Sequence, residues 1–415
     1  MPKGQAGVAA RRVWPRASCP VSGAAEPSVE RIARWSMYLH RLELRDFRNW
    51  SRLDLTLPEG MVIFHGPNGA GKTNLLESIC LAAAGDSPRA HESQDMIRLA
   101  EEVAFVRADF HGLDRRPRLE IGLARSGQKQ VKVNGAPKRR SDLIGLAPVV
   151  YFSADDIAVI KGEPSARRRF LDAEISAISQ SYYFQLIRYR RSLEQRNRLL
   201  KDIRSGRARP SALDPWDRSL AKHGAAVIVK RRGFAADLAP EAAAAHDLLT
   251  GHARGLVVAY RPSIGPLDEQ DSRAALEEPA SLVGNIAIHL ESVWREERQN
   301  DILRGATGAG PHRDDLEVLL RGEPVRLFGS QGEQRTCAVA LRIGLASVVR
   351  SATGDRPVLL LDDVLSELDA RYRAGVFAAC AQAQQVIITC CDPADIPAQA
   401  RESAASFEVR DGRLI

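Results

Sequence analysis

The fold is decided by the stretch Gly66-Pro67-Asn68-Gly69-Ala70-Gly71-Lys72-Thr73. It fits the pattern G-x-x-x-x-G-K-[ST], in which backbone N–H groups of a glycine-rich turn surround the phosphates of a nucleotide. In this pattern Lys72 reaches the β- and γ-phosphates and Thr73 binds Mg²⁺. A strand must precede the turn and a helix must follow it. The apolar run 61–64 and the helix-compatible run 73–84 satisfy both conditions, so an α/β nucleotide-binding domain is predicted.

A second motif is the apolar run 358–361, which ends in Asp362 and Asp363. Alone, such a run often marks only a buried strand that enters a polar loop. A buried parallel strand would place both carboxylates at the carboxyl end of the sheet, where open α/β sheets bind ligands. We therefore expect Asp362 to bind Mg²⁺ together with Thr73. Lys72 and Asp363 are the expected catalytic residues, and Asp363 would orient or deprotonate the attacking water.

The third motif, Ser330-Gln331-Gly332-Glu333-Gln334, begins a helix predicted over 334–349. A Ser-x-Gly turn at a helix N-terminus offers oriented dipoles to a γ-phosphate. The ordinary alternative is a helix cap, in which Ser330 caps the helix and Glu333 completes a capping box. The position just upstream of the acidic strand is typical of ABC-type ATPases, where the signature motif of one subunit covers the nucleotide of another. We expect Ser330 and Gly332 to contact the nucleotide in this way.

Further motifs in residues 37–415 resemble those of the RecF family, DNA repair members of the ABC ATPases related to SMC heads. They are Arg45-Asp46-Phe47-Arg48-Asn49, Phe152 with the run 162–172, Gly310-Pro311-His312-Arg313-Asp314-Asp315, and Ser366-Glu367-Leu368-Asp369. The last is similar to the loop that touches the partner subunit. The resemblance implies an ABC-type ATPase head, with a P-loop parallel sheet and an antiparallel β part, plus an inserted, mainly helical second lobe.

The same resemblance implies an ATP-dependent DNA-binding protein of recombinational repair and replication restart. Its ATP-gated homodimer would bind gapped DNA, where duplex lies beside a single strand. It would work with RecO and RecR, help to load RecA, and contribute to SOS induction. ATP and Mg²⁺ are the implied cofactors.

Two positions depart from the usual ABC pattern. The predicted strand 386–389 leads into Cys390 and Cys391, so the histidine that commonly follows this strand is missing, and Thr389 is only a weak substitute. Asp363 stands where transporters usually have glutamate, and it is one methylene shorter. The shorter carboxylate is consistent with a slow ATPase that serves as a timer or clamp, and we expect a weak, DNA-stimulated ATPase that acts as a switch.

The chain has 415 residues, a net charge of +7 and a pI near 9.2, which fit a polyanionic partner. The positive charge is concentrated in residues 161–232, which hold 18 Lys and Arg against 7 Asp and Glu. A solvated helical face is the ordinary alternative for such a run. Because the run lies in one inserted region beside an ATPase head, we expect contacts with the DNA backbone.

Composition and periodicity divide the chain into three parts. Residues 1–36 are proline-containing and aperiodic, so they are predicted to be a disordered or mis-assigned extension before Met37. Residues 37–150 and 305–415 form the predicted first lobe. Residues 151–304 form the predicted arginine-rich second lobe, with helices expected over 183–203, 216–234, 235–246 and 291–303.

Other classes fit less well. The nucleotide-binding subunit of an ABC transporter would show an L-S-G-G-Q signature, a histidine at position 390 and an apolar coupling surface. A small-molecule P-loop kinase would have no need of the motif at 330–334. No membrane-spanning run and no C-x-x-C spacing occur, which favours a cytoplasmic protein without membrane partners.

The spacing of the motifs predicts that two chains are needed. Thr73 and Ser330 are 257 positions apart and lie at opposite ends of one head in the resembling fold. A two-fold axis would bring each P-loop against the Ser330 of the other copy. Two roles stay open: Arg48 either extends toward the nucleotide or pairs with a core carboxylate, and His312 either links the lobes or senses the nucleotide.

Overall fold

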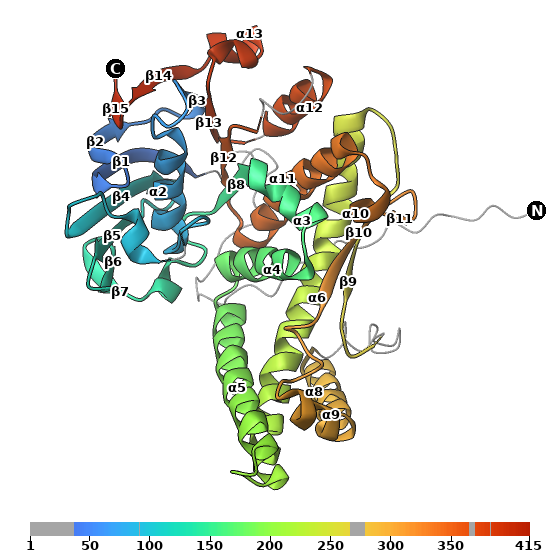
Figure 1. Cartoon of the computed structure of the whole chain (residues 1–415). Coiled ribbons are helices and arrows are strands. Elements are labelled where there is room, and N and C mark those ends of the chain that lie inside the picture. Colours follow the sequence, from blue (N-terminus) through green and yellow to red (C-terminus); the bar gives the residue numbers. More distant parts are fainter. Residues whose placement is uncertain (1–36, 91, 266–278, 365–369, 382) are drawn as a thin grey trace, which may run out of the picture.

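The computed structural model describes residues 37–90, 92–265, 279–364, 370–381 and 383–415. The predicted extension over 1–36 and the predicted partner-touching loop 366–369 lie outside the described residues. Figure 1 shows the two larger sheets at one end of the molecule and a group of long helices that extends away from them. The predicted α/β head with a mainly helical second part is therefore confirmed.

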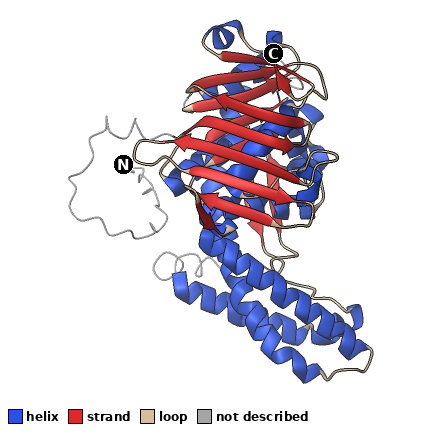
Figure 2. Cartoon of the chain, turned by 90° about the vertical axis from the view of Figure 1, so that its left-hand side faces the viewer, coloured by secondary structure: helices blue, strands red, loops and turns tan. Residues whose placement is uncertain are grey.

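An antiparallel sheet forms one layer of the head, with strand order β2-β1-β4-β5-β6-β7. Its strands are β1 (Tyr38–Phe47), β2 (Trp50–Thr56), β4 (Val103–His111), β5 (Arg118–Ala124), β6 (Lys129–Val133) and β7 (Ala136–Lys138). Alternate residues of β4 are buried, as the apolar alternation predicts. Asn134 and Gly135, both with positive φ, make the tight turn between β6 and β7. Figure 2 shows this sheet face-on, with helices behind it.

A second sheet carries the P-loop, with strand order β15-β14-β3-β13-β12-β8. Its strands are β3 (Gly60–His65), β8 (Val149–Ser153), β12 (Val358–Asp362), β13 (Gln385–Cys390), β14 (Ala405–Arg410) and β15 (Arg413–Leu414). All are parallel except β15, which pairs antiparallel with β14. Val358 and Leu360 face the core shared with the antiparallel sheet, whereas Leu359 and Leu361 face the core shared with the long helices. Burial on both faces explains why β12 is an unbroken apolar run.

The P-loop helix α2 (Lys72–Ala84) contacts strands of both sheets. Residues 75–83 are all buried, as expected of a helix that is enclosed on all sides. The predicted helix over 73–84 is confirmed. Its position between two sheets holds its N-terminus in a fixed place relative to the acidic strand.

The second part is helical. Its helices are α3 (Ile157–Lys161), α4 (Pro164–Ile178), α5 (Gln180–Arg204), α6 (Asp214–Thr250), α8 (Pro279–Glu296) and α9 (Arg298–Arg304). The helices predicted over 216–234 and 235–246 are one helix, because α6 continues through Pro240. Just beyond Pro240, α6 packs closely on α11 (Gln331–Thr353), where a Cβ on Gly344 would lie 2.6 Å from the Ala242 nitrogen. Tertiary packing outweighs the cost of the internal proline.

A small sheet joins segments from both sides of position 305. Its order is β11-β10-β9, built from β9 (Leu256–Arg261), β10 (Asp315–Leu320) and β11 (Glu323–Pro324). Since α6 and α11 also share one core, the lobe boundaries at 150 and 305 stay a prediction. The short elements are α10 (Val325–Phe328), α12 (Ala370–Cys380), α13 (Ala398–Glu402), η1 (Ser93–Met96), η2 (Arg140–Leu143), η3 (Ala154–Asp156), η4 (Pro210–Leu213) and η5 (Pro393–Asp395).

Helix α11 is long and apolar enough to cross a membrane, the one such helix in the described part of the chain. It packs against α6 and β8 instead, and eleven of its 23 residues are buried. Core helices of globular proteins commonly have this length and composition.

Candidate functional site

The P-loop turn connects β3 to α2 at the carboxyl end of the parallel sheet. Gly66 has a φ of +146° and Gly71 a φ of +111°, which side chains rarely allow. A Cβ on Gly66 would lie 2.2 Å from the Val409 carbonyl oxygen, and one on Gly71 would lie 2.5 Å from the Asn49 amide. The glycines are therefore required by close packing as well as by backbone conformation. The turn ends at the N-terminus of α2, which favours an anion.

The opening motif of the chain supports the P-loop from outside. Asn49 donates from Nδ2 to the Ala70 carbonyl oxygen (2.9 Å), and Trp50 donates from Nε1 to the Gly71 carbonyl oxygen (3.0 Å). From the C-terminal hairpin, the Gly412 N–H also donates to the Ala70 oxygen (2.9 Å). Two distant segments thus hold the turn in place.

Arg48 pairs with a core carboxylate, one of the two roles that the sequence leaves open. Its Nε and Nη2 donate to both oxygens of Glu77 in α2, at 2.9 and 2.8 Å. Glu77 is fully buried, so this bidentate pair supplies the counter-charge that a buried carboxylate needs. Arg48 therefore braces α2.

Lys72 lies over the P-loop. Its buried ammonium donates to the carbonyl oxygens of Gly66 (2.6 Å) and Pro67 (2.9 Å). Cys391, at the carboxyl end of β13, lies beside it, with Sγ 3.9 Å from Nζ and 2.9 Å from the Asn68 Oδ1. The charge of Lys72 is thus available where the phosphates of a nucleotide would lie.

Thr73 and Asp362 meet although they are far apart in sequence. The Thr73 hydroxyl donates to Asp362 Oδ1 at 2.9 Å. Their oxygens are hard donors, which suit Mg²⁺, and Mg²⁺ typically takes one or two protein ligands plus water and phosphate oxygens. Within the described residues there is no cluster of three or more His, Cys, Asp or Glu that could hold a metal alone. The donor set therefore fits an Mg²⁺ that is completed by nucleotide.

Asp362 also accepts hydrogen bonds from two hydroxyls that the sequence motifs do not include. Thr389 donates to Oδ1 (2.7 Å) and Tyr151 donates to Oδ2 (2.7 Å). Thr389 is buried and directed at the acidic strand. This position gives Thr389 a supporting role for the carboxylate.

Asp363 has a left-handed backbone, with a φ of +53°. Its N–H donates to the Thr389 backbone oxygen (3.3 Å) and hydroxyl oxygen (3.1 Å). Aspartate tolerates this region better than most residues, and such conformations concentrate at functional sites. The partly exposed carboxylate lies just beyond Asp362 at the end of the strand.

The Ser330 turn caps α11, as the capping-box alternative predicts. The Ser330 Oγ accepts from the Glu333 N–H (3.3 Å), and the Glu333 carboxylate accepts from the Ser330 N–H (3.0 Å). The Ser330 N–H and the Arg321 guanidinium together lower the pKa of Glu333 to about 2. Ser330 and Gly332 are exposed, and open space surrounds the position where a Cβ of Gly332 would be. Because the Ser330 turn is exposed, it can cap its own helix and still contact a second molecule.

The two halves of the predicted site do not meet within one chain. Helix α10, which directly precedes Ser330, lies on the opposite side of Figure 1 from the P-loop helix α2. The structure thus brings together Lys72, Thr73, Asp362 and Asp363, and leaves Ser330 and Gly332 apart from them.

Three arginines of the positive run 161–232 are buried. Arg167 pairs with Asp315 (2.6 Å), which links the family-like motifs at 162–172 and 310–315, and Arg231 pairs with Asp172 (2.7 Å). Arg196 is the third. These arginines stabilise the fold and are not available to DNA. The expectation that the positive charge of residues 161–232 contacts DNA therefore does not extend to these three.

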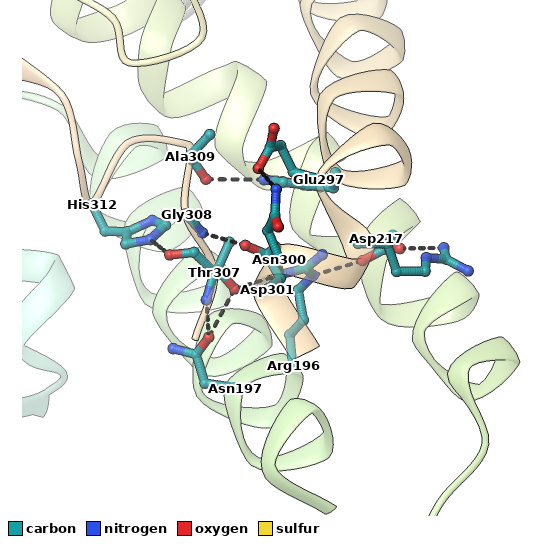
Figure 3. A network of polar contacts seen from close by, with 12 residues as sticks. Arg196, Asn197, Asp217, Glu297, Asn300, Asp301, Thr307, Gly308, Ala309 and His312 are labelled. Carbon is teal, nitrogen blue, oxygen red and sulfur yellow. Dashed lines mark hydrogen bonds and ion pairs between the residues drawn. The ribbon is translucent and has the colours of Figure 1, made fainter. Parts of the chain in front are cut away.

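Arg196 is the centre of a buried polar network (Figure 3). Its Nε donates to Asp217 and its Nη1 to Asp301, both at 2.7 Å, and Nη1 also donates to the Thr307 hydroxyl (2.8 Å). The guanidinium lies over the Trp294 ring, 5.4 Å from its centroid. The network ties α5, α6, α8 and α9 to the returning chain.

His312 belongs to the same region. Its Nε2 lies 3.0 Å from the Thr307 carbonyl oxygen and must donate to it, so Nδ1 accepts from the Tyr189 hydroxyl (2.6 Å). Burial lowers the pKa of His312 to about 4, so the ring is neutral at physiological pH. Of the two roles left open, these contacts match a link between α5 and the returning chain.

Other cations of the run are exposed. Nine have no ion-pair partner within the described residues, and they are Lys161, Arg169, Arg188, Arg191, Lys201, Arg204, Arg209, Arg218 and Lys222. Most of them lie on or between α5 and α6, the helices that extend away from the sheets in Figure 1. They form a positive surface distinct from the buried arginines.

Comparisons with known proteins agree with this architecture. Residues 38–412 match the model of the RecF/RecN/SMC N terminal domain. The DNA replication and repair protein RecF of Lachnospira eligens is 34% identical over 384 residues, covering 91% of this chain and 99% of that protein. The RecF protein of Roseiflexus castenholzii is 36% identical over 402 residues, with coverage of 91% and 99%.

Solved structures give the same result. A structure described as the recombination mediator protein RecF-ATPrS in the RecFOR pathway superposes with a TM-score of 0.81 at 31% identity, covering 91% of this chain and 98% of that one. An Smc head bound to the C-winged helix domain of ScpA has a TM-score of 0.50 at 15% identity, covering 91% and 97%, which shows a likeness of fold alone. The chain belongs to the RecF family.

Proposed function

We propose that this protein is an ATP-dependent DNA-binding protein of recombinational repair and replication restart, in which two copies enclose ATP between them. The observation that carries the proposal is the separation of the P-loop from the exposed Ser330 turn within one chain. Each turn offers helix N-terminal dipoles to a phosphate, but only a two-fold arrangement brings both to the same nucleotide. The similar RecF structures named for ATP and ATPrS support ATP as the ligand.

The surface next to Ser330 supports self-association. Leu327 and Phe328, which directly precede the turn, are 63% and 68% exposed. Adjacent large apolar side chains on a surface commonly mark a place where another protein surface binds. A second copy approaching Ser330 would cover them.

The chemistry assigned to the site is phosphoryl transfer to water. Lys72 binds the β- and γ-phosphates, Thr73 and Asp362 hold Mg²⁺, and Asp363 orients or deprotonates the water. Bound Mg²⁺ neutralises charge that develops on the phosphates. The short Asp363 side chain and the absence of a histidine after β13 fit a weak, DNA-stimulated ATPase that acts as a switch.

The exposed cations on α5 and α6 support DNA as the partner, because phosphate contacts from Lys and Arg dominate nucleic-acid affinity. We assign gapped DNA, duplex beside a single strand, as the preferred form. The RecFOR pathway named for the similar structures supports RecO and RecR as partners, with roles in RecA loading and SOS induction. A cytoplasmic location follows from these roles.

The decisive experiment combines sizing of the full chain with its ATPase rate. ATP should produce a dimer, whereas ADP and buffer should leave a monomer. The ATPase rate should be low alone and rise with gapped duplex DNA, and Asp363→Asn should trap the ATP-bound dimer. A monomer that hydrolyses ATP at full rate, unaffected by protein concentration or DNA, would refute the proposal.

A salt titration tests the DNA surface separately. Replacing Arg188, Arg191 and Arg218 with Gln should lower the slope of log affinity against log salt by about 0.9 for each phosphate that these side chains neutralise. Arg52→Gln, which changes an exposed cation on β2, is the control and should leave the slope unchanged. DNA binding that is insensitive to salt would point to another surface.

A further inference from the structure

Three hydroxyl groups converge on the carboxylate of Asp362. Thr73 and Thr389 donate to Oδ1 at 2.9 and 2.7 Å, and Tyr151 donates to Oδ2 at 2.7 Å. Within the described residues, the Tyr151 hydroxyl is the one hydrogen-bond donor to Oδ2. Thr73 belongs to the P-loop motif, whereas Tyr151 lies on β8 and belongs to none of the nucleotide-binding motifs.

The register of the parallel sheet places Tyr151 where it can make this contact. β8 pairs with β12 so that Tyr151 lies opposite Leu360 and Ser153 lies opposite Asp362. Residues two apart on a strand share a face, so Tyr151 and Asp362 project from the same face of the sheet. The contact is thus built into strand pairing and does not depend on a flexible loop.

The Tyr151 hydroxyl is the donor in its hydrogen bond with Asp362. An ionised carboxylate has no proton to donate, so the proton in this hydrogen bond belongs to Tyr151. Hydrogen bonds to both oxygens then fix the rotation of the Asp362 carboxylate.

We propose that Tyr151 is a positioning residue, which holds Asp362 in the orientation that binds a divalent cation together with Thr73. The inference rests on the proposed Mg²⁺ site. Outer partners of this kind orient metal ligands, and their removal typically lowers metal affinity about 10- to 100-fold. Since Tyr151 touches Asp362 through one hydroxyl, we expect an effect near the lower end, about tenfold.

The test is a Mg²⁺ titration of nucleotide binding by the full-length Tyr151→Phe variant. A fluorescent ADP analogue is the probe, because ADP is proposed not to drive self-association. The variant should need about tenfold more Mg²⁺ for half-maximal binding, and should match the parent protein in EDTA. Tyr38→Phe is the matched control, since it removes a hydroxyl on β1 that lies 3.5 Å from His111 and belongs to the antiparallel sheet, whereas Asp362 lies on the parallel one.

A double mutant separates positioning from a general structural effect. If Tyr151 acts through the carboxylate, Tyr151→Phe should add no further change in the Mg²⁺ requirement in an Asp362→Asn background. The inference about Tyr151 would be wrong if Tyr151→Phe left the Mg²⁺ requirement unchanged, or if it changed nucleotide binding equally in EDTA. Neither result would contradict the proposed metal site. If Mg²⁺ did not change the nucleotide affinity of the parent protein, the proposed metal site would be wrong as well.

Discussion

The P-loop and the Ser330 turn both lie at the N-terminus of a helix, yet the protein holds them in different ways. Distant segments support the P-loop through Asn49, Trp50 and Gly412. The Ser330 turn is held mainly within its own first helical turn, by the capping box with Glu333. The P-loop is exposed at its tip, residues 67–69, but its two ends are buried, whereas residues 330–332 of the other turn are all exposed.

This difference predicts that the two functions can be separated. A rigid, supported turn can bind phosphate without reorganisation, which favours binding by a single chain. An exposed, locally held turn contributes only when a second surface arrives. Mutations in the P-loop should therefore abolish nucleotide binding, whereas mutations at Ser330 should affect association alone.

The largest effect is expected for Lys72→Met. Loss of the ammonium removes charge-assisted contacts to phosphate, and nucleotide affinity should fall at least about 100-fold, or ~2.7 kcal/mol. Titration with a fluorescent nucleotide measures the change. Lys132→Met, on β6 of the other sheet, is the matched control. Normal nucleotide binding by Lys72→Met would show that the P-loop does not bind the nucleotide.

The next effect concerns association. Ser330→Arg should weaken ATP-driven self-association at least about tenfold and leave nucleotide binding by the monomer unchanged. Ser330→Asp is the sharper variant, because aspartate keeps the helix cap but places negative charge toward the phosphates. Sizing and nucleotide titration give the two readouts.

The matched control for these variants is Ser403→Arg, an exposed serine near the C-terminus. It should behave like the parent protein in both measurements. Equal self-association by the parent and both Ser330 variants would show that this turn does not meet the nucleotide of a second copy.

Much of the head could be predicted from sequence because its signals are local. The glycine pattern, the strand before it and the helix after it all lie within about 25 residues, and β12 is a continuous apolar run. The continuity of α6 through Pro240 could not be predicted, since it depends on packing against α11. The pairing of β9 with β10 depends likewise on contacts across a long segment.

Site residues outside the motifs have no distinctive signal in the sequence. Tyr151 lies in a run of apolar and aromatic residues that indicates only a buried strand, and its contact with Asp362 depends on the register of two strands. Arg167, Arg196 and Arg231 looked equivalent to the exposed arginines in the charge count. Only the fold shows their carboxylate partners.

A smaller effect is expected where the P-loop is supported. Asn49→Ala removes the hydrogen bond to the Ala70 oxygen and the acceptor for Asn74 (2.9 Å). Nucleotide affinity should fall about fivefold, or ~1 kcal/mol, because each hydrogen bond contributes modestly. Asn300→Ala removes a comparable contact on α9 and is the control. If Asn49→Ala has no effect, the P-loop holds its shape without this support.

The smallest effect should be a pH dependence of the Ser330 turn. The Ser330 N–H and Arg321 lower the pKa of Glu333 to about 2 from an ordinary value of 4.5. A carboxylate whose pKa is lowered by folding stabilises the folded protein at pH values above its ordinary pKa. This contribution is lost as the pH falls toward 2. Glu333→Gln keeps a capping partner but not the charge, so the parent should be more stable by at most about 1 kcal/mol at pH 7. Thermal melting should show this difference shrinking between pH 5 and pH 3. A difference that is constant over this range would mean that the charge of Glu333 does not hold the turn.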